Sequence, residues 1–120
     1  MPRKADIRLD ILIKKEENYY TGHCLQFDIV ATADTLKDTH KAILELCAAH
    51  ISFSIDHDNT EHMFFPAPPP VWAEYYSLTN DPSCRIDQGE LEVQVDGTER
   101  HPAHPAFMIQ EIVCNEQAAI

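Results

Sequence analysis

The carboxylates are the side chains whose chemistry could make this chain an enzyme. Asp10, Glu45 and either Asp56 or Asp58 could hold two divalent metal ions for nucleic-acid hydrolysis. Asp10 and Glu45, however, fall on the polar sides of the elements expected to carry them, where a solvated carboxylate is the default. The chain also has few cations to hold a nucleic-acid substrate. We therefore predict no catalytic residue, no metal site and no enzymatic activity.

Histidines and cysteines give no stronger catalytic pattern. His101 and His104 are three residues apart, but two prolines interrupt their segment, so loop histidines are the expected reading. Cys47 and His50 share the expected apolar face of a helix, where a buried and hydrogen-bonded histidine is more common than a ligand. A Cys–His nucleophile would need a third group to orient the base, and none is identified. We expect no cofactor.

The four cysteines also bear on the compartment. Cys24, Cys47, Cys84 and Cys114 are scattered, with no C-x-x-C pair and no signal peptide before them. This pattern predicts a reduced, cytoplasmic protein. No apolar run approaches the roughly 20 residues that span a bilayer, so no membrane role is expected.

Length and charge limit the function classes. The 120 residues suit one domain, and a formal charge of −11 argues against nucleic-acid binding. Residues 1–60 hold ten acidic against seven basic side chains, and residues 61–120 hold ten against two. Such an acidic surface suits a basic protein partner, although a solvated acidic face without a partner has the same composition.

The first third of the chain predicts an antiparallel meander. Ile7, Leu9, Ile11 and Ile13 alternate with polar residues, with Leu12 as the exception, as in a strand with one buried face. The stretches NYYTGHCL and FDIVATA predict two further strands. Gly22, in the second of these strands, marks a bulge or a close approach of another backbone.

An amphipathic helix is predicted next, over residues 36–52, fading near Phe53 to Ile55. Thr35 is the expected N-cap, and Asp38 occupies the capping-box position. Apolar or small side chains then recur every three or four residues on one face of the helix. They are Leu36, Thr39, Ala42, Ile43, Leu46, Cys47, His50 and Ile51.

The stretch FFPAPPPVWAEYY follows. Its proline run favours polyproline II, and Pro70 can begin a short helix that carries Trp72, Tyr75 and Tyr76. Packing within the chain, across one end of the sheet, is the first interpretation. Use of the aromatic side chains in an interface is the second.

Strand patterns return in the tail. Leu91, Val93 and Val95 alternate with polar residues, and Asp96-Gly97 is a turn signal. The stretch AFMIQEIV predicts the returning strand. Residues 85–114 are thus expected to form a hairpin with a long irregular tip, which either extends the first sheet or pairs with another copy of the chain.

The meander and the stretch ATADTLKDTHKAILEL together resemble the HicB-like family over residues 7–58. The family has a helix start of the type D-T/S-x-E-E-A, which here has Lys37 in one acidic position and Thr39 in place of Ala. The resemblance implies an α+β fold with an antiparallel β-β-β-α-β, partial RNase H-like core. A C-terminal β-hairpin would extend it. We expect the core over residues 1–62, a Pro/aromatic connector over 63–80 and the hairpin over 81–120, all in a single domain.

The resemblance also implies a function. Antitoxins of this family bind a small basic RNA-cleaving toxin and mask it, and many carry a DNA-binding tail, which the acidic tail here does not resemble. We expect steric and electrostatic masking of such a toxin, with Asp28, Trp72, Glu74, Tyr75 and Tyr76 as partner contacts. Self-association into a dimer or larger homo-oligomer is expected as well. The alternatives are a metal-dependent RNase H-like hydrolase using Asp10, Glu45 and Asp58, and a solitary homo-oligomer without a toxin.

Overall fold

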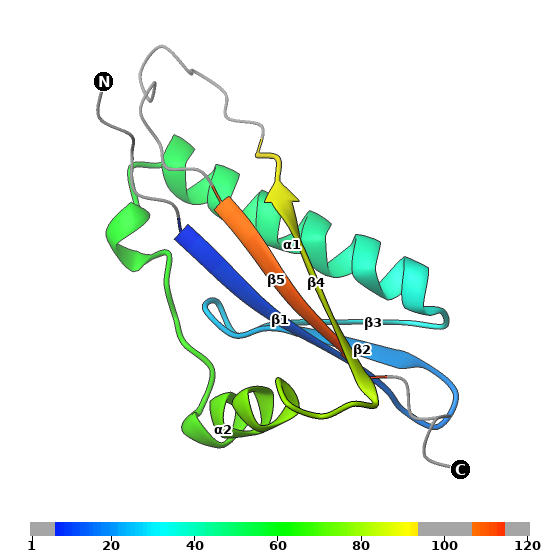
Figure 1. Ribbon diagram of the computed structural model, residues 1–120. Helices are drawn as coiled ribbons and strands as arrows, with labels where there is room; N and C mark the ends of the chain where they lie inside the picture. Colours follow the sequence, from blue (N-terminus) through cyan, green and yellow to red (C-terminus); the bar gives the residue numbers. More distant parts are fainter. Residues whose placement is uncertain (1–6, 94–106, 115–120) are drawn as a thin grey trace.

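Strand β1 (Ile7–Lys15) is the central strand of a five-stranded sheet, and its two neighbours run in different directions (Figure 1). It pairs antiparallel with β2 (Tyr20–Cys24) on one side and parallel with β5 (Phe107–Cys114) on the other. The strand order is β3-β2-β1-β5-β4. The computed structural model describes residues 7–93 and 107–114 of the chain.

The remaining elements complete an α+β fold with a mixed sheet. They are β3 (Ile29–Ala33), α1 (Leu36–Asp56), the 3-10 turn η1 (Thr60–His62), α2 (Pro69–Leu78) and β4 (Cys84–Leu91). The first three strands form the predicted antiparallel meander. The prediction of an entirely antiparallel sheet is wrong, because β5 enters alongside β1 in the same direction.

The late strands belong to the same sheet as the meander. β4 pairs antiparallel with β5, so the predicted hairpin extends the first sheet within one chain. β4 begins at Cys84 and ends at Leu91, earlier than the alternation of Leu91, Val93 and Val95 indicated. Val95, the Asp96-Gly97 turn and the segment of His101 and His104 lie outside the described residues.

Helix α1 begins where its capping residue predicts. The Thr35 hydroxyl oxygen accepts a hydrogen bond from the Asp38 backbone N–H at 3.0 Å, which satisfies one of the free donors of the first turn. The helix continues to Asp56, past the predicted fading point. Leu46 was expected on the inward face, but it is 45% exposed.

The first core fills the space between α1 and one face of the sheet. Leu9, Ile11 and Ile13 of β1 pack against Ile43 and Ile51 of α1, all of them fully buried. A Cβ at Gly22 would lie 3.3 Å from the Thr39 methyl group and 3.4 Å from Ile43 Cβ. The glycine therefore marks a close approach of α1 to β2, one of the two readings of its position.

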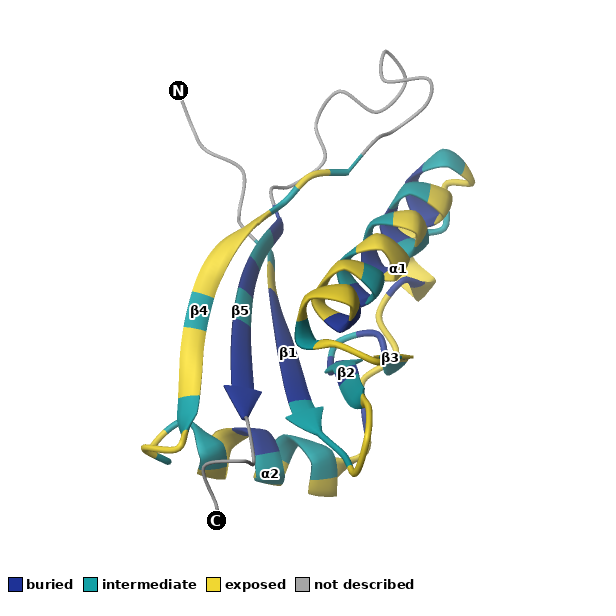
Figure 2. Cartoon of the chain, turned by 90° about the vertical axis from the view of Figure 1, so that its right-hand side faces the viewer, coloured by how far each residue is buried: buried dark blue, intermediate teal, exposed yellow. Residues whose placement is uncertain are grey.

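A second core lies on the opposite face of the sheet, beneath α2. Leu12, the exception in the alternation of β1, is buried there with Leu25, Tyr75 and Ile112. Figure 2 shows α2 crossing one end of the sheet, away from α1. The aromatic stretch therefore packs mainly within the chain, as its first interpretation proposed.

The proline run connects the two cores. Phe65 and Ala67 donate backbone hydrogen bonds to the carbonyls of Gln26 and Leu25, at 2.9 and 2.8 Å. Helix α2 then begins at Pro69, one residue before the predicted position. The segment thereby carries the chain from the end of α1 to the other face of the sheet. No helix in the described part is long and apolar enough to cross a membrane.

A disulfide links the two strands of the late hairpin. Cys84, the first residue of β4, is bonded to Cys114, the last of β5, and the two are paired in the sheet register. The prediction of four reduced cysteines is therefore wrong for this pair. Cys24 and Cys47 are free thiols, and both are buried in the first core.

Reduction of this disulfide should lower the free energy of unfolding. The bond closes a loop with a sequence separation of 30, for which about 2–4 kcal/mol is typical. Urea denaturation of the oxidised and reduced protein measures the difference. The Cys84→Ser variant should match the reduced protein and should not respond to reductant. Four titratable thiols in the unreduced, unfolded protein would contradict the bond.

Candidate functional site

Asp10 is the most completely buried carboxylate of the described chain, although a solvated position was predicted for it. It is 2% exposed, on the β1 face beneath α2. Its Oδ1 accepts from the Tyr75 hydroxyl at 2.8 Å and pairs with Arg8 Nε at 3.0 Å, and its Oδ2 accepts from Gln26 Nε2 at 2.8 Å. The Asp10 backbone N–H donates to Gln26 Oε1 at 2.7 Å. Both carboxylate oxygens and the backbone N–H of Asp10 therefore have partners, as buried polar groups require.

The contacts around Asp10 join four parts of the fold. Tyr75 belongs to α2 and Gln26 to the β2–β3 connection. Gln110 of β5 donates from its side-chain amide to the Tyr75 hydroxyl at 3.2 Å. Burial, and then the hydrogen bond to Asp10, raise the pKa of Tyr75 well above its ordinary value, so the phenol stays protonated as a donor. The network therefore links α2 and the β2–β3 connection to β1 and β5, which is a structural role.

The proposed metal-binding carboxylates do not meet. Asp10 lies on the α2 side of the sheet, whereas Glu45 is exposed on α1 and Asp58 follows that helix, on the other side. Among residues 7–93 and 107–114, no three His, Cys, Asp or Glu side chains gather closely enough to hold a metal ion. The described residues thus offer no two-metal site of the kind that hydrolysis of nucleic acid requires.

Cys47 and His50 occupy the positions expected of packing residues. The Cys47 thiol is buried and shares a hydrogen bond with Cys24. His50 Nε2 lies 2.7 Å from the Met63 carbonyl oxygen, and its ring packs 4.6 Å from that of Phe27. This nitrogen is bonded to the backbone, as in the expected hydrogen-bonded histidine.

A shallow groove opens beside α2, where that helix leaves β2 and β3 uncovered. Its volume is about 250 Å³, and we call it the β2–α2 groove. Its apolar lining consists of Leu12, Val30 and Val71. Its polar lining consists of Lys14, Glu16, Thr21, His23 and Glu74. An apolar floor with charged walls is typical of a surface that binds a protein or peptide.

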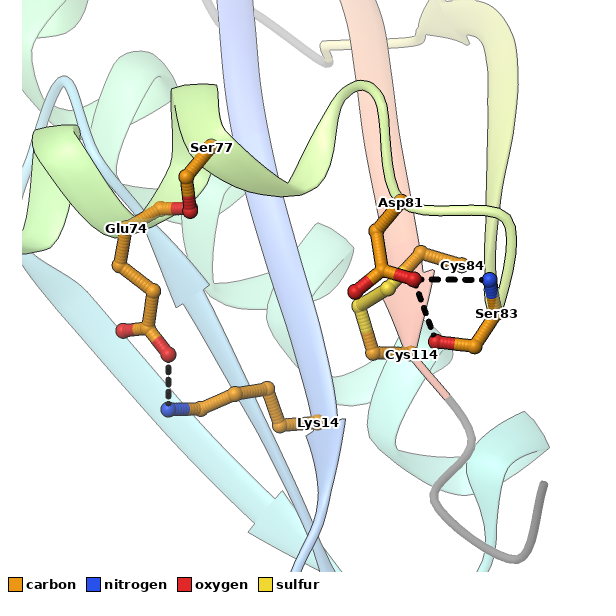
Figure 3. The surroundings of a disulfide bond; sticks show 7 residues. All are labelled: Lys14, Glu74, Ser77, Asp81, Ser83, Cys84 and Cys114. Carbon is orange, nitrogen blue, oxygen red and sulfur yellow. Dashed lines mark hydrogen bonds and ion pairs between the residues drawn. A yellow bond between two sulfur atoms is a disulfide. The ribbon is translucent and has the colours of Figure 1, made fainter. Parts of the chain in front are cut away.

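Two acidic side chains, Glu16 and Glu74, line this groove, and a third, Asp28, adjoins it through His23. Glu74 Oε2 accepts from Lys14 Nζ at 2.8 Å, as Figure 3 shows near the disulfide. Glu16 accepts from the Thr21 hydroxyl at 2.8 Å, and His23 Nε2 lies 2.7 Å from Asp28 Oδ1. Each acid is thus held in place by one neighbour while staying in partial contact with solvent.

The predicted partner contacts occupy three environments. Glu74 lines the groove, and Asp28 reaches it through His23. Tyr75 is fully buried, so it cannot touch a partner while the second core is closed. Trp72 and Tyr76 stack with ring centroids 6.1 Å apart, and helical geometry places them on the other side of Tyr75 from Glu74. Tyr76 is 50% exposed, whereas Trp72 donates its indole N–H to the Ala67 carbonyl oxygen.

A second polar pair, missed by sequence reasoning, joins α1 to β5. Glu111 is 3% exposed, and its Oε2 lies 2.7 Å from Nδ1 of His40, which donates to the carboxylate. Burial raises the pKa of Glu111, and the hydrogen bond from His40 opposes the shift. Asp87 and Arg85 of β4 and Lys37 of α1 line the same hollow of about 290 Å³.

The period-two pattern of β5 could have identified Glu111 as a residue that faces α1. Glu111 has the same phase as Phe107 and Ile109, so it faces α1, whereas Ile112 has the opposite phase and is buried under α2. Because Nδ1 of His40 is hydrogen-bonded to the Glu111 carboxylate, Nε2 is the ring nitrogen left to contact another group. No Ser, Thr or Cys is among the described residues that line the hollow.

Comparison of the chain with protein-family models, curated proteins and solved structures gave no significant match.

Removal of the Tyr75 hydroxyl should destabilise the fold. Tyr75→Phe leaves a buried carboxylate oxygen of Asp10 short of one donor, which typically costs about 1–3 kcal/mol of unfolding free energy. The matched control is Tyr76→Phe on the exposed neighbour, expected within about 0.5 kcal/mol of wild type. Urea denaturation measures both variants. Equal stabilities for the two would refute the role assigned to the Asp10 network.

Glu111 should make stability depend on pH. Its pKa is raised in the folded protein above the unfolded value of about 4.3, so the stability from its protonated form is present below that value. That contribution is lost as the pH rises through the folded pKa. Glu111→Gln should therefore gain stability relative to wild type as the pH rises from about 4 to 7. A stability difference that is constant over this range would contradict the assignment.

Proposed function

We propose that this chain is a HicB-like, antitoxin-type binding protein that sequesters a small basic RNase toxin by steric and electrostatic masking. The observation that carries the proposal is the β2–α2 groove, where Glu16, Glu74 and the Asp28–His23 pair surround an apolar floor. Basic side chains of a partner would meet these acids while its apolar side chains covered Val30 and Val71. Such an interaction requires no covalent bond to be made or broken.

Charge distribution along the chain supports a basic partner. Residues 42–84 contain no Lys or Arg, and they contain six acids. These are Glu45, Asp56, Asp58, Glu61, Glu74 and Asp81. A field of one sign speeds the encounter with an opposite charge and disfavours nucleic acid.

The element order supports the family resemblance. An antiparallel meander leads into α1 after Asp34-Thr35, and a later strand, β5, lies beside β1 in parallel. This order agrees with the expected β-β-β-α-β core, whereas the parallel direction of β5 departs from its antiparallel pairing. α2 and β4 stand between α1 and β5 as additions to it.

The proposal places the protein in the cytoplasm, where a disulfide is seldom maintained. The β4–β5 ladder, which pairs eight residues of each strand, holds Cys84 and Cys114 opposite each other. Self-association stays a prediction. Phe53 and Phe65, at 59% and 70% exposure, are the apolar side chains that would serve it.

The alternatives receive less support. The hydrolase reading needs Asp10, Glu45 and Asp58 in one site, and the sheet separates Asp10 from the other two. A solitary homo-oligomer would leave the β2–α2 groove without a partner.

The function is tested with the small basic protein encoded beside this chain's gene. Excess chain should stop that protein's RNA cleavage. Glu74→Lys should weaken the complex about tenfold at low salt, because it reverses one charge in the groove. The control is Glu45→Lys, an equal charge change on the exposed side of α1.

Unchanged RNA cleavage in excess chain would refute the proposal. The lack of any short basic reading frame beside the gene would refute it as well. Equal effects of Glu74→Lys and Glu45→Lys would move the binding surface away from the groove.

A further inference from the structure

The two edge strands of the sheet differ in how they are protected against pairing. β4 carries charged or polar side chains along most of its length, namely Arg85, Asp87, Gln88 and Glu90. β3 is IVATA and contains no Lys, Arg, Asp, Glu or Pro. Natural sheets usually protect a free edge with charges, prolines or bulges, because unpaired N–H and C=O groups bind other strands. β4 has this protection and β3 lacks it.

The exposed side of β3 consists of uncharged, β-branched side chains. Val30 is 50% exposed, and Thr32 is exposed beside it on the same face. Within the described residues, the sheet pairs β3 with β2 alone. Alternate backbone groups of an edge strand point away from its neighbour, so β3 can accept one more strand.

Two hollows lie along this face, where side chains of an added strand would point. Val30 lines the β2–α2 groove. Thr32 lines a second hollow of about 530 Å³ with Asn18, Tyr19, Ala33 and Asp34. Strand addition commonly draws affinity from main-chain hydrogen bonds and selectivity from such alternating side-chain positions.

Charge decides between a second copy and a different partner. Asp28 precedes β3 and Asp34 follows it. An antiparallel pair of two β3 strands centred on Ala31 would bring Asp28 of each copy near Asp34 of the other, just beyond the ends of the strands, and neighbouring like charges are destabilising. A strand with a basic residue at each end would instead meet an acid at both ends.

We propose that a partner adds a β-strand to the free edge of β3, and that this strand is short, β-branched and flanked by Lys or Arg. The identity of that partner as a basic toxin rests on the proposed function. The pairing itself depends only on the edge, on Val30 and Thr32, and on the two flanking aspartates.

The probe for this edge is the peptide Lys-Val-Thr-Val-Thr-Val-Lys, added at millimolar concentration to the full chain. Amide hydrogen exchange followed by NMR should slow about tenfold or more in β3 and stay unchanged in β4. The acidic counterpart Glu-Val-Thr-Val-Thr-Val-Glu should protect neither edge. High salt should reduce the effect of the basic peptide.

Two matched variants locate the contact. Val30→Lys places a cation on the proposed edge and should reduce protection by the basic peptide about tenfold. Ile86→Lys makes a similar change on the other edge strand, at a side chain of 43% exposure, and should leave protection unchanged. Thr32→Lys serves in place of Val30→Lys if that variant does not fold.

Absence of protection in β3, or equal protection of β3 and β4, would overturn the proposal. Protection of β3 without peptide, together with a dimeric mass by light scattering, would assign the edge to a second copy and overturn it also. The two proposals fail separately. A toxin inhibited without β3 protection would refute strand addition alone, whereas peptide protection without toxin inhibition would refute the antitoxin function alone.

Discussion

The buried carboxylate of Asp10 is the constraint on which the arrangement around β1 depends. An ionised carboxylate without partners is very costly to bury, so its oxygens must be satisfied by donors from the surrounding elements. Tyr75, Gln26 and Arg8 supply those donors, and Gln110 bonds the Tyr75 hydroxyl in turn. These residues come from α2, the β2–β3 connection, β1 and β5. The Asp10 side chain therefore fixes the position of α2 on the sheet.

The position of α2 determines which part of the sheet stays open. The helix covers Leu12 and Ile112 at one end of the central strands, and the second core is closed there. Residues on the same face of β2 and β3 are left beside the helix, where Val30 and Glu74 line a common groove. A packing requirement at Asp10 thus produces a surface at β3, with Lys14 and Glu74 joining the helix to β1 at its border.

The first half of the fold was largely predictable because its signals are local. Alternation in β1 and the Thr35 cap each depend on residues close together in the sequence, so the meander and α1 emerged as expected. Gly22 belongs with them, since a missing side chain in a strand indicates close packing. Leu46 shows the limit of this reasoning, because helical periodicity places a residue on a face without saying how far the sheet extends beneath it.

The second half depended on pairing that local patterns do not encode. The sequence by itself determined the strand character of β5, the aromatic anchor of α2 and the acidic balance of the surface. Only the tertiary structure decided that β5 lies parallel to β1, that Cys84 meets Cys114, and that Asp10 and Glu111 are buried. The physical reason is that the burial of a polar side chain depends on which distant elements supply its partners, and periodicity describes only the element that carries it.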